Sequence, residues 1–417
     1  MGNDTGVEIM APAGSYESLM AAVNAGATSI YFGVGNLNMR SKSANFELED
    51  LVKVAGICSK NKVRSYLTLN TIMYDEDLAD ARKICDLALS AKLSAVIASD
   101  ISVIEYARSI GLEVHISTQL NVANVDAVRF FSRYADVLVL ARELSLGQIE
   151  HICHEIKREN ICGPSGEQVK IEVFIHGAMC VAISGKCYMS LAQYNSSANR
   201  GRCLQTCRRR YRVIDEETDE ELIIDNKFVM SPKDMCTIKM LDKLIDAGVG
   251  VLKIEGRARG PEYVDTVVRQ YKKALTLIAA EEYDDQHKVE LEKELKRVFN
   301  RGFWENGYYL GNRLGDWSGA YGSQATTKKI LVGRVVNFYK KVMIAEILVE
   351  SGEISRGDQI AFTGTTTGIV YSEVDMILDS SDVETVMLKK GSTGTIKLKQ
   401  VVRRNDKVFL VKPRNAN

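Results

Sequence analysis

The sequence is poor in proline and carries no excess of either charge. Five prolines in 417 residues exclude a collagen-like or proline-rich chain. Equal numbers of basic and acidic residues, 54 of each, exclude a protein that binds nucleic acid through its overall charge. No apolar run reaches the length of a membrane span, and residues 1–9 lack the basic and apolar segments of a secretory signal. We therefore expect a soluble protein of the reducing cytoplasm, with no membrane partner.

In a reducing compartment, the nine cysteines need an explanation other than disulfide bonds. Five of them are scattered along the chain, and free cysteine often fills protein cores. The other four fall within 28 residues, in the pattern C-x6-C-x15-C-x3-C. These four are Cys180, Cys187, Cys203 and Cys207. Such clustering indicates a shared site.

Four thiolates brought to one point suit a tetrahedral zinc ion or an iron–sulfur cluster. Zinc ribbons usually separate paired cysteines by two to four residues, whereas six residues lie between Cys180 and Cys187. This spacing favours iron–sulfur. A radical-SAM motif would need a third cysteine where the chain has Arg210. Coincidental clustering of free thiols is the remaining alternative.

Short β-rich runs alternate with amphipathic helical stretches from residue 7 to about residue 256. The expected strands are Val7–Met10, Ser29–Phe32, Arg64–Leu69, Ala95–Ala98, Glu113–Ser117, Val137–Ala141, Glu172–His176 and Val251–Glu255. Eight β-then-α units predict an α/β fold, either a doubly wound sheet or a (β/α)8-type barrel, and the number eight favours the barrel, regular or irregular.

The predicted organisation has three parts. The barrel occupies residues 1–282, with a cysteine- and arginine-rich loop, 177–227, inserted after the seventh strand. A charged linker is expected at 283–327. Period-two runs separated by glycine-containing turns then predict a small antiparallel β-barrel domain at 328–417.

The active site of a parallel β/α barrel lies at the carboxyl ends of its strands. The polar side chains expected there, which are the catalytic candidates, are His115, Arg142, Glu172, His176 and Glu255. His176 stands four residues before Cys180, so the seventh strand would deliver the cysteine loop to the barrel mouth. The alternative for each candidate is a structural role in a hydrogen bond or an ion pair.

Arginine is concentrated beside the cysteines. Six arginines fall within 13 residues, at 200–212, and five of them are the candidate anion- or nucleic-acid-binding residues. These five are Arg200, Arg202, Arg208, Arg209 and Arg210. The guanidinium group suits phosphate and carboxylate, so the segment predicts an anion site; a solvated loop is the alternative.

The cysteine cluster lies in a run from Glu172 to Ser190 that contains His176-Gly-Ala-Met-Cys180. His115-Ile-Ser-Thr-Gln119 and Lys253-Ile-Glu-Gly-Arg257 accompany it. Together with further stretches over essentially the whole chain, these motifs resemble the collagenase-like peptidases of unassigned mechanism, a family that includes tRNA and rRNA hydroxylation proteins. Within that family the sequence looks most like the prephenate-dependent proteins that form 5-hydroxyuridine at the tRNA wobble position.

The resemblance implies an iron–sulfur cluster of the 4Fe-4S type, held by Cys180, Cys187, Cys203 and Cys207, with Cys236 left out. It also implies a tRNA substrate and an oxygen-independent hydroxylation that needs prephenate. A collagenase-like peptidase is the alternative, although the sequence has neither an H-E-x-x-H motif nor a G-x-S-x-G motif. A non-catalytic iron–sulfur scaffold that binds RNA is the third hypothesis.

Overall fold

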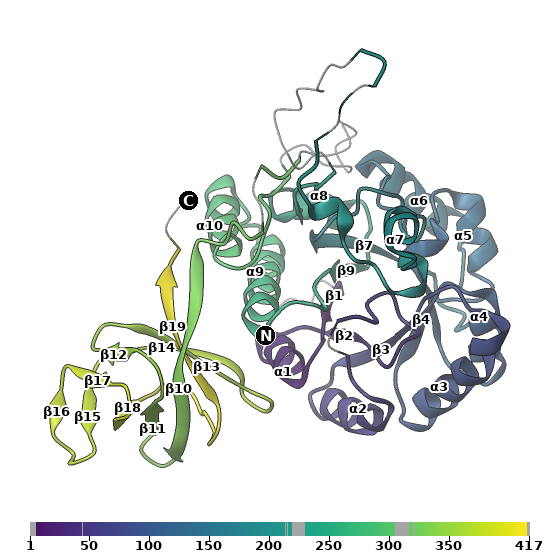
Figure 1. The fold of residues 1–417 in the computed structure, drawn as a ribbon. Coiled ribbons are helices and arrows are strands. Elements are labelled where there is room, and N and C mark those ends of the chain that lie inside the picture. Colours follow the sequence, from purple (N-terminus) through teal and green to yellow (C-terminus); the bar gives the residue numbers. More distant parts are fainter. Residues whose placement is uncertain are drawn as a thin grey trace.

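The computed structural model contains a barrel of strands and helices joined to a smaller all-β domain (Figure 1). The residues it describes are 6–43, 45–212, 214, 216–218, 230–304, 317–319 and 322–414. Among the helices of these residues, none is both long enough and apolar enough to cross a membrane.

Eight parallel strands form a closed barrel. They are β1 (Glu8–Pro12), β2 (Ser29–Gly33), β3 (Arg64–Leu69), β4 (Ala95–Ala98), β5 (Val114–Ile116), β6 (Val137–Val139), β7 (Lys170–Gly177) and β9 (Val251–Ile254). Each pairs with its neighbour, and β9 lies between β7 and β1, which closes the ring. Every predicted strand is present, and the predicted barrel is confirmed.

The helices that alternate with these strands cover the outside of the barrel (Figure 1). They are α1 (Tyr16–Ala25), α2 (Leu51–Lys60), α3 (Leu78–Ser90), α4 (Ile101–Ser109), α5 (Val125–Phe131), α6 (Leu146–Glu159), α8 (Leu241–Asp246) and α9 (Pro261–Ala279). Helix α6 shows why they form: Ser145 caps its first turn, and its buried residues Ile149, Ile152, Cys153 and Ile156 recur at helical spacing.

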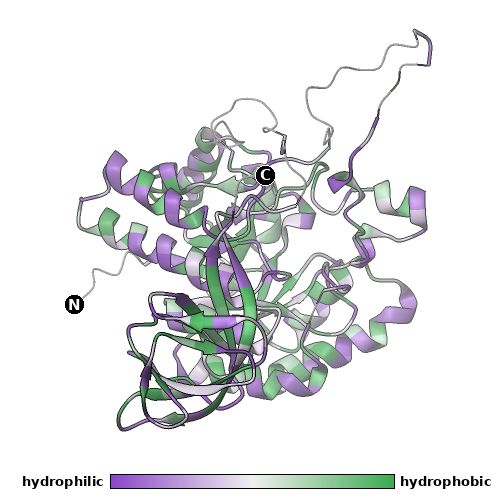
Figure 2. Ribbon diagram, turned by 60° about the vertical axis from the view of Figure 1, so that its left-hand side comes forward, coloured by the Kyte–Doolittle hydropathy of each residue, from purple (hydrophilic) through white to green (hydrophobic). Residues whose placement is uncertain are grey.

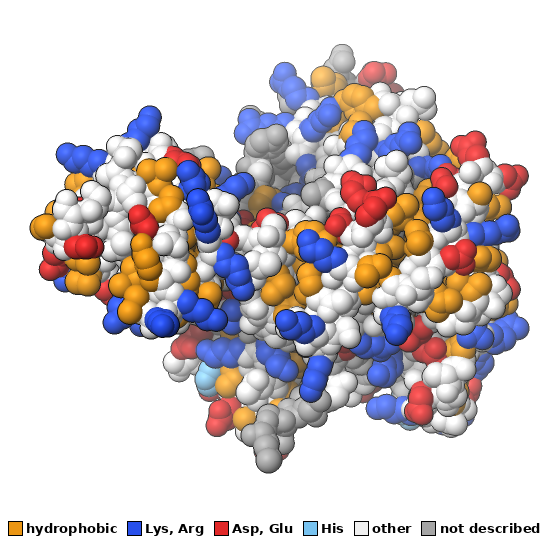
Figure 3. Space-filling view, turned by 90° about the horizontal axis from the view of Figure 1, so that it is seen from below, with side chains coloured by type: hydrophobic (Ala, Val, Ile, Leu, Met, Phe, Trp, Pro, Cys, Tyr) orange, Lys and Arg blue, Asp and Glu red, His pale blue; other side chains and the backbone are white. Residues whose placement is uncertain are grey.

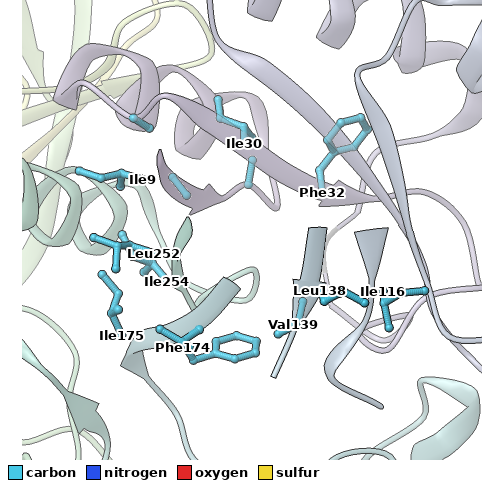
Figure 4. Close-up of a cluster of buried hydrophobic side chains, with 14 of the residues drawn as sticks. Ile9, Ile30, Phe32, Ile116, Leu138, Val139, Phe174, Ile175, Leu252 and Ile254 are labelled. Carbon is cyan, nitrogen blue, oxygen red and sulfur yellow. The ribbon is translucent and has the colours of Figure 1, made fainter. Parts of the chain in front are cut away.

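The main core lies between the barrel and its helices, where apolar side chains from neighbouring strands pack together (Figure 4). Hydrophobic positions follow the strands and the inner faces of the helices, and hydrophilic positions follow the outer faces (Figure 2). A second cluster, which includes Met10, Tyr66, Ile97 and Val137, comes from alternate positions of the strands. Since side chains alternate across a strand, this second set faces the barrel interior.

The barrel is irregular between β7 and β9. The chain after Gly177 forms a long loop that contains α7 (Met189–Tyr194), and it returns as β8 (Met235–Cys236), antiparallel to β7. Most of the hairpin-like stretch expected at 211–224 lies outside the described residues. The stretch expected as a charged linker contains helix α10 (Asp285–Leu295), which begins at the Asp284 cap and buries Leu291 and Leu295.

The C-terminal domain is antiparallel, as predicted. Its eight-stranded sheet has the order β14-β13-β19-β10-β11-β18-β15-β16, and β12 (Glu353–Ser355) and β17 (Met387–Lys389) form a separate ribbon. The bounds of the eight are β10 (Thr327–Tyr339), β11 (Ile344–Val349), β13 (Gln359–Gly364), β14 (Gly368–Glu373), β15 (Ile377–Asp379), β16 (Glu384–Thr385), β18 (Thr393–Lys397) and β19 (Lys407–Pro413). Within the described strands no pairing joins β14 to β16, so the sheet surrounds its own core without a closed ring of hydrogen bonds.

This domain packs against the barrel's first helix. Ala21 of α1 is buried with Ala361 and Ile369 of β13 and β14. Gly368 has a φ of +71°, in the left-handed region that favours glycine, and a Cβ there would lie 2.7 Å from the backbone nitrogen of Ala21. The close approach of the two domains therefore requires glycine at 368.

Candidate active site at the barrel mouth

Two adjoining cavities open at the carboxyl end of the barrel. The first, which we call the mouth cavity, has a volume of about 80 Å³. The second, the thiol cavity, has a volume of about 100 Å³. Met39, Arg40, Cys180, Gly185 and Glu255 line both, so a ligand in one lies next to a ligand in the other.

Arg142 is buried in the mouth cavity, and no carboxylate of the described residues forms an ion pair with it. Only 8% of the residue is exposed, and its guanidinium lies 3.9 Å from the centre of the Phe174 ring. Nη1 donates a long hydrogen bond of 3.4 Å to the backbone oxygen of Ala178, and Nε has no partner. A buried guanidinium that is so poorly satisfied is costly, which marks a position where an anionic ligand would be stabilised.

Lys253 and Glu172 form a buried ion pair below this position. Their side chains are 6% and 0% exposed, and Lys253 Nζ lies 2.6 Å from Glu172 Oε1. Glu172 Oε2 has no partner. Glu172, expected at the mouth as a catalytic residue, thus serves to neutralise Lys253, which does line the mouth cavity.

Two further arginines line the mouth cavity. Arg40 Nη2 lies 2.7 Å from Glu255 Oε1. Burial acts to raise the pKa of Glu255, but the charge of Arg40 and its hydrogen bond hold that pKa below its ordinary value. Arg257 Nη1 donates to Asn38 Oδ1 at 2.9 Å and to Thr68 Oγ1 at 2.8 Å, both neutral, and burial lowers its pKa to about 10.

All four clustered cysteines line the thiol cavity, while the other five lie elsewhere. Burial raises the pKa of the Cys207 thiol to about 11; Arg208 opposes this effect, and the charges of Cys180, Cys203 and Cys187 add to it. Cys207 is therefore close enough to the other three cysteines to be repelled by their charges when they are ionised. A metal centre would remove this repulsion.

The thiol set suits a multi-iron cluster. In the described part of the chain, no three His, Cys, Asp or Glu side chains lie close enough together to hold a single metal ion. A tetrahedral zinc site needs all four sulfurs about 2.3 Å from one point, whereas each iron of a cluster takes its own cysteine. All four thiols line one cavity, which is the arrangement that a shared centre requires. Iron–sulfur binding itself stays a prediction.

The structure does not place His176 at the mouth. Its ring lies outside the barrel against Tyr263 and Tyr271 of α9 and against Phe303, at centroid distances of 5.9, 5.7 and 5.3 Å. Burial lowers its pKa to about 3. The pairing of β7 with β9 shifts register between Phe174 and His176, which changes the side to which the histidine points.

His115 also lies away from the mouth cavity. Its ring faces the barrel interior against Tyr66, and Nε2 is 3.1 Å from Glu113 Oε1. Glu113 lines a third cavity, at the opposite end of the barrel. Of the five catalytic candidates, only Arg142 and Glu255 therefore line the mouth cavity.

The arginine-rich segment divides into anchors and exposed residues. Arg200 donates to the backbone oxygen of Ile72 at 2.8 Å and pairs with Asp77. Arg208 donates to Ser231 Oγ at 3.0 Å, to the oxygen of Pro232 at 2.7 Å and to that of Met179. These two arginines fix the loop to the barrel, and their role as anion-binding residues stays a prediction. Arg202, Arg209 and Arg210 are exposed.

Arg40 is one of the mouth residues that the sequence did not single out. It lies in the loop that follows β2, a strand for which no catalytic candidate was proposed. Its position after the carboxyl end of β2 was the available signal, because every such loop of a β/α barrel reaches the mouth.

Comparison with known proteins places the chain in a family. The model of "Peptidase family U32" matches residues 14–318. A protein named collagenase from Porphyromonas gingivalis is 53% identical over 96% of this chain and 97% of its own length. "tRNA hydroxylation protein P1" of Bacillus subtilis is 31% identical over 90% of this chain and 88% of its own.

A further relative is the "23S rRNA 5-hydroxycytidine C2501 synthase" of Escherichia coli, which is 32% identical over 74% of this chain and 46% of its own length. By identity the chain is thus more similar to the collagenase-named protein than to either RNA hydroxylation protein. Proteins named as collagenases and proteins named for RNA hydroxylation therefore occur within one family. This chain belongs to peptidase family U32.

Proposed function

We propose that this protein is an iron–sulfur enzyme that hydroxylates the wobble uridine of tRNA to 5-hydroxyuridine, without oxygen, with prephenate as co-substrate. One observation carries the proposal: a cationic cavity with an unpaired buried arginine shares a wall with a cavity lined by four cysteines. The RNA hydroxylation proteins among its relatives supply the reaction class.

The charges of the mouth cavity fit a dianion. Four cations surround it, and two carboxylates neutralise two of them: Glu255 pairs with Arg40, and Glu172 pairs with Lys253. In the part of the chain that the structure describes, neither Arg142 nor Arg257 forms an ion pair with a carboxylate. Prephenate carries two carboxylates. We assign one of them to Arg142 and the other to Arg257, because each guanidinium can bind a carboxylate through two N–H groups.

The thiol cavity takes the cluster beside the co-substrate. Cys180, Cys187, Cys203 and Cys207 would hold it, and when bound it would supply a Lewis acid or a carrier of single electrons. Arg40 and Glu255 stand on the shared wall and fix the position of the ligand there. A target base must leave its stack to reach this wall, as in other enzymes that modify bases.

The second candidate is peptide hydrolysis, which the name of the Porphyromonas relative favours. A cysteine peptidase needs a histidine beside its nucleophile. All five histidines of the chain lie in the described part, and none lines the thiol cavity or the mouth cavity. The cysteines of the site therefore have no general base of the usual kind, which favours the first candidate.

The test uses tRNA from a strain that lacks the gene. Nucleoside mass spectrometry should find no 5-hydroxyuridine, and a plasmid copy of the wild-type chain should restore it. The protein purified without oxygen should be coloured and contain iron and sulfide. Unchanged 5-hydroxyuridine in the deletion strain would overturn the proposal, and a colourless protein that cleaves gelatin would establish the peptidase.

A further inference from the structure

The segment from Gly177 to Arg212 is strongly basic within a neutral protein. It contains seven basic residues, Lys186 and six arginines, and no aspartate or glutamate. Elsewhere the charges are mixed: on the face shown in Figure 3, basic and acidic side chains are interspersed over both domains. Residues of this segment, among them Arg208, also line the thiol cavity, so the positive charge of the segment lies beside the proposed site.

Three large aromatic side chains are exposed on segments next to this cavity. Tyr74, Tyr188 and Tyr194 are 54%, 69% and 47% exposed. Arg200 lies 4.2 Å from the centre of the Tyr74 ring, and Arg209 lies 5.0 Å from that of Tyr194. Each of these two rings is thereby held in place from one side.

All three tyrosines are tied to the wall of the thiol cavity. Tyr188 follows Cys187, which lines the cavity. Tyr194 ends α7, which contacts the short helix Thr206–Arg208 that carries Cys207. Near Tyr74, the amide of Ile72 donates to the backbone oxygen of Asn199, another lining residue.

We propose that Tyr188, supported by Tyr74 and Tyr194, forms a stacking platform for unpaired nucleotides of RNA. The inference rests on the proposed function and names the form of RNA that it accepts. Aromatic rings interleaved with arginine suit single strands, because an unpaired base offers its face for stacking whereas a duplex covers both faces. The exposed Arg202, Arg209 and Arg210 contact the phosphates of the same strand.

Tyr188 is the decisive residue of the platform. It is the most exposed of the three rings, and in the described part of the chain no cation or aromatic ring is stacked on it. Its face is therefore available for a base. Because Cys187 is adjacent, the nucleotide on Tyr188 flanks the base that enters the site, and both must come from a loop rather than a helix.

The experiment measures the affinity of the holoprotein for two RNAs: a tRNA anticodon stem-loop and a fully paired duplex of the same length. Tyr188→Ala should weaken stem-loop binding roughly 5- to 100-fold, the range for losing one stacked base, and leave duplex binding unchanged. Tyr188→Phe keeps the ring and should bind like wild type. Tyr339→Ala, which removes an exposed tyrosine of the C-terminal domain, is the matched control and should also bind like wild type.

Unchanged stem-loop affinity in Tyr188→Ala would overturn the platform, and so would equal losses on the loop and the duplex. Cluster absorption recorded for each variant shows that the site is intact. The inference and the reaction can fail separately. Tyr188-dependent binding of the loop, together with unchanged 5-hydroxyuridine in the deletion strain, would support the platform and overturn the reaction.

Discussion

The two ends of the barrel differ in size and in the state of their charges. The cavity at the amino end of the strands is the larger, about 620 Å³, against about 80 and 100 Å³ for the two at the mouth. At the amino end, Arg64 lies 2.8 Å from Glu113, and Tyr66 donates to Glu8 at 2.8 Å. At the mouth, no carboxylate of the described residues pairs with Arg142.

Volume alone therefore does not identify the reactive end. A satisfied ion pair gains little from a ligand, whereas a buried, unpaired guanidinium gains the full interaction. His115 Nδ1, in the barrel interior, is also unpartnered, but Nε2 of the same ring lies 3.1 Å from Glu113 Oε1, so this ring already has a carboxylate partner. The proposed chemistry therefore belongs to the smaller cavities, and matched substitutions in and away from the mouth test this.

The largest effect is expected at the four clustered cysteines. Replacing any one with serine, for example Cys203→Ser, should abolish visible absorption, iron content and 5-hydroxyuridine, because serine is a poor ligand for iron in a cluster. Cys162→Ser, in the loop after α6, is the control and should leave all three unchanged. Cys236→Ser should also keep its iron. If Cys236→Ser instead lost its iron while Cys207→Ser kept it, Cys236 would be the fourth ligand in place of Cys207.

The second comparison is between two ion pairs. Lys253→Met leaves Glu172 buried and uncompensated, and we expect the free energy of unfolding to fall by about 3–5 kcal/mol. Arg64→Met breaks the ion pair between Arg64 and Glu113, whose two side chains are 39% and 30% exposed, respectively. We expect this change to lower the free energy of unfolding by less than about 1 kcal/mol. Urea unfolding measures both.

A control for this comparison removes the stranded charge. The double variant Lys253→Met with Glu172→Gln should recover much of the lost stability, since neither partner then remains charged. Equal losses in Lys253→Met and Arg64→Met would show that the two ends of the barrel are electrostatically alike.

The third comparison tests the anion site. Arg142→Lys keeps a positive charge but loses the two parallel N–H groups and the planar contact with Phe174. We expect kcat/KM for prephenate to fall about 100-fold, or about 2.7 kcal/mol, which is the scale of hydrogen bonds to a charged group. Arg64→Lys, at the other end, should change it little. An Arg142→Lys enzyme with normal kcat/KM would remove Arg142 from the site.

The sequence predicted all eight strands of the barrel because each is a short β-rich run between amphipathic helical stretches. It predicted a linker where α10 forms, since the abundant charge of 284–296 concealed the helical spacing of Leu291 and Leu295. The sequence did not reveal that Arg200 and Arg208 anchor the loop. The partner of Arg200, Asp77, lies 123 residues away in the chain. The local pattern of apolar and polar residues predicts helices and strands. The role of a charged side chain depends on partners that are distant in the sequence.

The orientation of His176 was equally inaccessible from the sequence. Strict alternation along β7 would have placed it on the side of Glu172 and Phe174, inside the barrel. The register shift next to it places it outside, among the aromatic rings of Tyr263, Tyr271 and Phe303. A catalytic histidine must reach the substrate. Because His176 is buried away from the mouth cavity, we expect it to affect stability rather than chemistry, and the pH dependence of unfolding measures that effect.

The smallest expected effect comes from this histidine. Burial lowers the pKa of His176 to about 3, whereas the unfolded chain has a histidine pKa of about 6.5. Between these values the unfolded state binds more protons than the folded state, so the free energy of unfolding falls as the pH falls, by up to about 1.4 kcal/mol per unit. Above about pH 6.5 this contribution is constant.

From pH 6 to pH 4 the wild type should therefore lose about 2 kcal/mol more than His176→Gln. His151→Gln, on the exposed side of α6, should follow the wild-type curve. Urea unfolding at pH 6, 5 and 4 tests this, and parallel curves for wild type and His176→Gln would show that the histidine is accessible to protons in the folded protein.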